Sequence, residues 1–257
     1  MTVESVELPG GLAPAVDTAP EVPRITVLQH SSDVPLGLLG PALGDAVRVV
    51  RLDLGEPVPA AGEVGSGLVV LGGHMSAYDD AVAPWLPATR ALLADAVRDG
   101  VPTLGVCLGA QLLAVATGGT VAVAAPPGRE AGVVSVHWRA GAASDPVLGP
   151  VVAAARDGVT RAVSMHADAV CELPPGAAWL GWSHQYPYQA FRLGSALGVQ
   201  FHPEAGKSIA LDWARKCPDV DAAEVDAAMN ACGADLAHLV LALGRAFAAQ
   251  VDAYAAR

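Results

Sequence analysis

The sequence predicts an α/β fold with an open, mostly parallel central sheet, helices on both faces and antiparallel strands added at an edge. Between residues 24 and 116, strand-like and helical segments follow the order strand, helix, strand, strand, helix, strand, helix. From residue 120 onward the chain changes to short strand-like runs broken by glycine and proline, which is typical of antiparallel additions. The composition, 53% hydrophobic against 16% charged residues, indicates a large core.

The parallel part of the sheet is expected in the first half of the chain. Its strands are predicted at residues 24–29, 47–52, 67–71 and 103–106, and its helices at 36–46, 85–99 and after residue 107. The run 67–71 is apolar throughout, as in strands that are buried on both faces. Pro87 lies near the start of the second helix and Gly100 just past its end, where helices commonly place these residues.

The second half adds short strands and then returns to helix. Strands are predicted at residues 120–123, 132–136, 162–166, 179–183, 189–193 and 197–201. Near the C-terminus, seven apolar residues share one helical stripe, which predicts an amphipathic helix docked on the domain: Leu236, Leu239, Val240, Leu243, Phe247, Val251 and Tyr254. We therefore expect a flexible N-terminal extension over 1–22 and a single domain over 23–257, with a helical C-terminal extension from about residue 207.

Charge and cysteine usage narrow the classes of function. The chain has 15 basic and 26 acidic residues, a net charge of −11, which disfavours general binding to nucleic acid or to anionic membranes. We find no uninterrupted apolar run of ~20 residues and no secretory signal at the N-terminus. The four cysteines, at positions 107, 171, 217 and 232, form no CxxC pair and no metal-ligand spacing. These features predict a reduced cytoplasmic protein that uses no metal or cofactor.

The stretch from Gly105 to Gln111 is the strongest functional signal. It places Cys107 where a predicted strand becomes a helix, with glycines two residues before and two residues after it. This is the pattern of a nucleophile elbow, in which a Cβ at either glycine would obstruct close backbone contacts. The N-terminus of the following helix favours a thiolate. The alternative is an ordinary buried cysteine.

A glycine pair, Gly72 and Gly73, directly follows the predicted strand 67–71. Backbone N–H groups exposed at such a turn are the donors that an oxyanion hole requires. Taken alone, the pair is more typical of an ordinary strand-ending turn. Because ligands bind at the carboxyl ends of parallel strands, this loop and Cys107 are expected at one edge of the sheet.

A cysteine nucleophile needs a base with an orienting partner, and His202 with Glu204 fits that requirement. His202 ends the apolar run 197–201, and Glu204 follows two residues later. Side chains two apart in extended backbone point to the same side, so the carboxylate is expected to meet the imidazole. Without the elbow, a His-Pro-Glu turn is more often structural.

Taken together, these motifs resemble the class I, triad-type glutamine amidotransferases. The resemblance rests on 105–111 and on 199–204, and extends to the segments 72–80, 129–132, 165–168 and 188–192. It covers about residues 24 to 215 and is greatest to stand-alone members that are similar to the amidotransferase domain of GMP synthase. The fold it implies is the flavodoxin-like fold of that family.

The resemblance implies a reaction and a set of roles. Cys107 would attack the side-chain amide of glutamine, giving a γ-glutamyl thioester and ammonia, with His202 as base and then acid and Glu204 orienting it. The oxyanion would meet the N–H groups of Gly73 and Leu108. The pocket would further include three residues: Gln111, His166 and Asp168. A separate synthetase or ligase would receive the ammonia.

Two residues depart from the family pattern at the expected pocket mouth. His74 stands where proline is common, and Ala167 stands where a tryptophan or a small polar residue is usual. Two other functions therefore stay open. One is a γ-glutamyl hydrolase that cleaves a small γ-glutamyl compound with the same triad. The other is a non-catalytic binding or regulatory protein, although such proteins usually lose one of the three triad residues.

Overall fold

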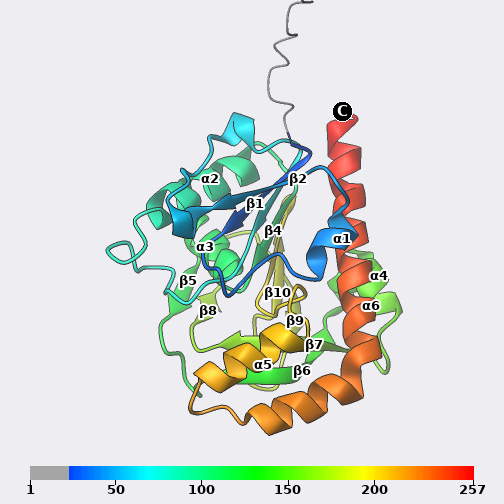
Figure 1. The fold of residues 1–257 in the computed structure, drawn as a ribbon. Coiled ribbons are helices and arrows are strands. Elements are labelled where there is room, and N and C mark those ends of the chain that lie inside the picture. Colours follow the sequence, from blue (N-terminus) through cyan, green and yellow to red (C-terminus); the bar gives the residue numbers. More distant parts are fainter. Residues whose placement is uncertain (1–22) are drawn as a thin grey trace, which may run out of the picture.

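A computed structural model describes residues 23–257, and the predicted N-terminal extension lies outside this range. The described chain contains a nine-stranded sheet in the order β2-β1-β3-β4-β11-β10-β9-β6-β7 (Figure 1). The strands β2, β1, β3, β4 and β11 run parallel, and the remaining four continue the sheet in antiparallel pairing. Their bounds are β1 Ile25–Gln29, β2 Val47–Arg51, β3 Gly67–Val70, β4 Thr103–Val106, β6 Glu130–Trp138, β7 Val159–His166, β9 Ala178–Trp182, β10 Ala190–Leu193 and β11 Ala196–Val199. The predicted fold class is confirmed.

One predicted strand is not part of this sheet. The run 120–123 forms β5 (Thr120–Ala122), which pairs with β8 (Ala169–Glu172) in a separate two-stranded antiparallel sheet. Val121 lies opposite Val170 in this pair, and both side chains are buried. The strand β8 was not predicted, since its second half is exposed and carries no alternation that distinguishes it from a loop.

Helices cover both faces of the large sheet, with α6 on one side and α2 and α3 on the other (Figure 1). Alternate residues of the same strand face different layers, as strand geometry requires. Val69 packs in the core beneath α1 and α6, whereas Leu68 and Val70 pack beneath α2 and α3. The helices are α1 Leu39–Leu43, α2 Leu86–Arg98, α3 Leu108–Ala116, α4 Gly149–Ala153, α5 Lys207–Lys216 and α6 Ala222–Ala255, with 3₁₀ turns at Leu52–Leu54, Ala61–Glu63 and Ala140–Ser144.

The helix predicted at 36–46 is shorter than expected. It is confined to α1, which contains a glycine and a proline and ends at Gly44, where φ is +93°. A residue other than glycine would be strained in that conformation. The helix predicted at 85–99 agrees with α2 to within one residue at each end.

The predicted C-terminal stripe is confirmed in α6. Asp221 caps the helix by accepting hydrogen bonds from the N–H groups of Ala223 and Glu224. Five members of the stripe are buried and two are half-buried, and the helix packs against α1, α4, α5, β6 and β7. Within residues 23–257, α6 is also the one helix whose length and apolar composition alone would suffice for a membrane span.

The order of the strands sets the position of the site. The strands β3, β4 and β11 are neighbours in parallel register, with Val70 beside Gly105 and Val106 beside Val199. The chain segments that follow these three strands therefore emerge side by side. They contain Gly72, Cys107 and His202.

Candidate active site

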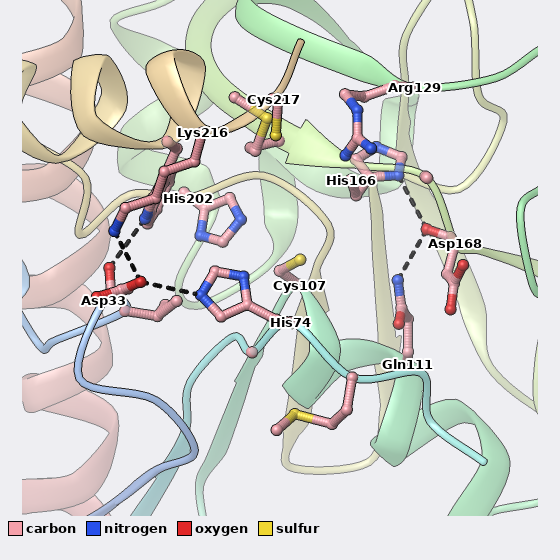
Figure 2. Close-up of a pocket in the computed structure, with 16 residues that line it drawn as sticks. Asp33, His74, Cys107, Gln111, Arg129, His166, Asp168, His202, Lys216 and Cys217 are labelled. Atoms are coloured by element: carbon pink, nitrogen blue, oxygen red, sulfur yellow. Dashed lines mark hydrogen bonds and ion pairs between the residues drawn. The ribbon is translucent and has the colours of Figure 1, made fainter. Parts of the chain in front are cut away.

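The sharp turn between β4 and α3 carries Cys107. Its φ is +50° and its ψ is −107°, and it occupies the N-cap position of α3. The Cys107 N–H donates to the carbonyl of Val199 at 2.8 Å, which ties the turn to the end of β11. The side chain is 5% exposed and its sulfur points into a pocket (Figure 2).

Both glycines of the elbow are required by close backbone contacts, as predicted. A Cβ added at Gly105 would lie 2.6 Å from the carbonyl oxygen of Gly109. A Cβ added at Gly109 would lie 1.9 Å from the carbonyl oxygen of Val70. The start of α3 therefore packs directly on the backbone of β3 and β4.

The structure brings His202 and Glu204 together, but by a different local geometry from the one expected. β11 ends at Val199, and residues 201–204 form a turn instead of continuing the strand. The turn is closed by the Ala205 N–H, which donates to the His202 carbonyl. Within it, His202 Nδ1 lies 2.6 Å from Glu204 Oε1, and both side chains are buried.

The protonation of His202 is set by its two neighbours. Burial by itself would lower the pKa of the His202 imidazole, but the charges of Glu204 and Cys107 outweigh it and hold that pKa well above its ordinary value. His202 Nε2 is buried and has no hydrogen-bond partner among residues 23–257. The hydrogen bond between the imidazole and the Cys107 thiol is therefore not formed here. Such catalytic bonds commonly tighten only when substrate binds.

The two expected oxyanion donors lie beside the cysteine. Leu108 is the first residue of α3, so its N–H has no acceptor within the helix. Gly73 lines the same pocket as Cys107, and a Cβ at Gly73 would come within 2.8 Å of the Leu108 side chain. Both N–H groups therefore lie close to the turn that carries Cys107.

The pocket has a volume of about 450 Å³ and contains all the predicted substrate-binding side chains. Figure 2 shows His202 and His74 to one side of Cys107, and Gln111, His166 and Asp168 to the other. The Asp168 carbonyl is 2.8 Å from Gln111 Nε2, which donates to it, and 2.9 Å from His166 Nδ1. One backbone oxygen therefore orders both side chains.

A buried glutamate behind the pocket was not given a role from sequence. Glu130 begins β6 and accepts hydrogen bonds from the side chains of Ser164, Ser183 and Gln189, and its Oε2 lies 3.2 Å from His166 Nε2. Burial would raise the pKa of the Glu130 carboxyl, but the hydrogen bonds from His166 and Ser183 hold it below its usual range. Its only sequence signal was its place in the segment 129–132.

The pocket rim also contains residues that were assigned no role from the sequence. Trp213 and Lys216 come from α5, Cys217 follows that helix, and Arg129 precedes β6. Asp33 binds Lys216 at 2.8 Å and lies 3.5 Å from His74 (Figure 2). No spacing rule links these positions, because they come from four separate segments of the chain.

Three other histidines lie outside the pocket and do not compete for the role of base. His30 is buried, accepts a hydrogen bond from the Trp85 indole at 2.9 Å, and burial lowers its pKa to about 4. His137 stacks on Trp182 in the antiparallel part of the sheet. His238 lies within α6.

The fold and site define a class of protein. The family model described as glutamine amidotransferase class-I matches residues 42–210, well over half of the chain. The chain belongs to the class I glutamine amidotransferase family.

The similar curated proteins are larger enzymes. The chain is 36% identical over 138 residues to the glutamine-hydrolysing GMP synthase of Thermomicrobium roseum, a match that covers 54% of this chain and 23% of that protein. It is 35% identical over 145 residues to the GMP synthase of Trichormus variabilis, covering 56% and 24%. The chain thus spans about a quarter of the length of these relatives.

Two solved structures share the fold over nearly their whole length. A glutamine amidotransferase from Methylobacillus flagellatus has a TM-score of 0.71 and 27% identity, covering 88% of this chain and 95% of that one. A glutamine amidotransferase from Thermotoga maritima has a TM-score of 0.76 and 24% identity, covering 89% and 99%. At that identity, the second comparison supports the fold alone.

Proposed function

We propose that this chain hydrolyses the side-chain amide of glutamine and delivers the ammonia to an acceptor that a synthetase or ligase partner activates. The observation that carries the proposal is that Cys107 and His202 line one pocket at the carboxyl ends of β4 and β11, with Glu204 buried against His202 Nδ1. Membership of the amidotransferase family supports the choice of an amide as the substrate. A thiol nucleophile suits the reducing cytoplasm.

In the first half-reaction the Cys107 thiolate attacks the side-chain carbonyl carbon of glutamine. The carbonyl oxygen becomes an oxyanion, which the N–H groups of Gly73 and Leu108 stabilise, with each donor typically worth ~3 kcal/mol. As the C–N bond breaks, His202 gives its proton to the departing nitrogen, and ammonia leaves. A γ-glutamyl thioester remains on Cys107.

In the second half-reaction water replaces ammonia. Neutral His202 takes a proton from the water, whose oxygen attacks the thioester carbonyl. The C–S bond then breaks, glutamate is released, and the thiolate–imidazolium pair is restored. Glu204 keeps Nδ1 protonated and stabilises the imidazolium in both halves.

A second function is favoured by the shape of the pocket mouth. The volume of about 450 Å³ lies in the range of pockets that take drug-sized ligands. Ala167, which stands where a tryptophan or a small polar residue is usual, lines this pocket, and against a tryptophan it would leave space. A γ-glutamyl compound with a small amine substituent would use that space. The same triad would then act as a γ-glutamyl hydrolase.

One assay separates the two functions. Ammonia release from glutamine is compared with amine release from γ-glutamyl methylamide, with and without cell extract from the source organism. The proposal expects glutamine to be the better substrate, stimulation by extract, and loss of activity in Cys107→Ser. The matched control is Cys171→Ser, an exposed cysteine on β8. Cleavage of the methylamide that is faster than cleavage of glutamine would favour the γ-glutamyl hydrolase over the amidotransferase. Absence of both activities would overturn both proposed functions.

A further inference from the structure

The imidazole of His202 is confined by two neighbours besides Glu204. A Cβ added at Gly72 would lie 3.0 Å from His202 Cε1, so the imidazole ring packs directly against the backbone of Gly72. The indole of Trp213 also contacts the ring, with ring centroids 4.6 Å apart and planes inclined at 57°. A side chain at position 72 or a shift of the indole would therefore displace the base.

Trp213 is itself fixed in place. It lies in α5, is 4% exposed, and its indole N–H donates to the carbonyl of Asp33 at 2.9 Å. One turn further along α5, Lys216 binds the carboxylate of the same residue at 2.8 Å. Two bonds thus attach α5 to the loop that follows β1 (Figure 2 shows the second).

This confinement matters because His202 has only one ring hydrogen bond. The bond from Nδ1 to Glu204 fixes one corner of the ring, and Nε2 has no partner within the described residues. A ring held at one corner can still rock about that bond. Contact with the indole limits this motion, and the electron-rich face of an indole attracts a cation such as imidazolium.

We propose that Trp213 is a positioning residue of this site, which holds the His202 ring toward Cys107 and favours its imidazolium form over the neutral one. The inference rests on the proposed function, in which the Cys107–His202 ion pair is the reactive state. It adds a third support for that pair, after Glu204 and the N-terminus of α3. It also gives α5 a part in the chemistry beyond lining the pocket.

The test follows the ion pair without using a substrate. The rate of Cys107 alkylation by iodoacetamide is measured against pH by mass spectrometry of the Cys107 peptide. In Trp213→Leu the acidic limb of this profile should move up by about one pH unit, since a tenfold loss of the ion pair corresponds to one unit. Trp213→Phe keeps an aromatic face and should move the limb by much less. Trp179→Leu, at a half-buried tryptophan on β9, should leave it unchanged.

An isosteric change separates the electronic effect from packing. Trifluorotryptophan incorporated at position 213 keeps the shape of the indole and weakens its negative face, so the limb should move in the direction of Trp213→Leu. A limb that stays in place in the fluorinated protein and in folded Trp213→Leu would overturn the proposal, as would an equal shift in Trp179→Leu. Failure of the proposed function is a distinct outcome, seen as a wild-type protein that has the ion pair but releases no ammonia from glutamine.

Discussion

Nδ1 of His202 and Oε1 of Glu204 are 2.6 Å apart in a turn where both side chains are buried. The contact joins residues two apart in the chain, within a single turn. Glu204 is held in turn by the loop before α1, because its carbonyl accepts from the Leu38 N–H at 2.9 Å. The orientation of the base therefore depends on the turn and on the segments that pack against it.

Replacing Glu204 by glutamine tests this contact. The amide is close in shape but carries no charge, so the imidazolium of His202 loses its main support. We expect the rate of glutamine hydrolysis at saturation to fall by roughly 10²- to 10⁴-fold, in the range known for triad acids and general bases. Steady-state kinetics check this, with Glu172→Gln, an exposed glutamate on β8, as the control. A loss below tenfold would show that Glu204 does not orient the base.

The glycines of the elbow predict a contrast in stability. Gly109→Ala places a Cβ against the Val70 carbonyl, so α3 must move, and the free energy of unfolding should fall by at least ~2 kcal/mol. Gly233→Ala, in α6 where a Cβ meets nothing within 4 Å, should instead raise it by about 0.5–1 kcal/mol. Urea unfolding of both variants measures the difference. Equal effects would mean that the close approach at Gly109 does not constrain the fold.

His30 predicts a stability that depends on pH. Its pKa is about 4 in the folded protein and near 6.5 when unfolded, so the folded state favours the neutral ring. The resulting stability is complete above pH 6.5 and is lost as pH falls toward 4, by roughly 3 kcal/mol at about 1.4 kcal/mol per unit. In His30→Gln, which keeps an acceptor for Trp85, the decline between pH 6.5 and 4 should be smaller. If the free energy of unfolding fell with pH in the same way in both proteins, His30 would be excluded as the cause of the decline.

Labelling predicts which thiol is reactive. A glutamine-like electrophile should modify Cys107 first, and Cys171, Cys217 and Cys232 should be nearly inert. Cys217 is the demanding comparison, because it lines the same pocket without an adjacent base. Mass spectrometry of the modified peptides locates the label, and Cys217→Ser should be labelled at the wild-type rate. Earlier modification at any other cysteine would contradict the assignment of Cys107 as the nucleophile.

Features with a local physical cause could be predicted from the sequence. The glycines around Cys107 indicated backbone contacts that the structure contains, and the apolar stripe of α6 indicated the face that is buried. The proximity of Glu204 to His202 was anticipated, but for the wrong reason, since those residues form a turn and not a strand.

Features that depend on tertiary packing could not be predicted. Trp213 has the spacing of an ordinary core residue in a helix, and only the packing of α5 places it against His202. The burial of Glu130 depends on three partners that follow it by 34 to 59 residues. No local pattern encodes either relationship.

The bond from the Cys107 N–H to the Val199 carbonyl has a consequence for how this scaffold can diversify. It joins the turn that carries Cys107 to the end of β11, the strand that leads to His202. The loop that carries His74 and the turn that carries Ala167 line the pocket without contributing to that bond. New substrates can therefore be accommodated by exchanging those two segments, while α5 and the reacting atoms keep their places.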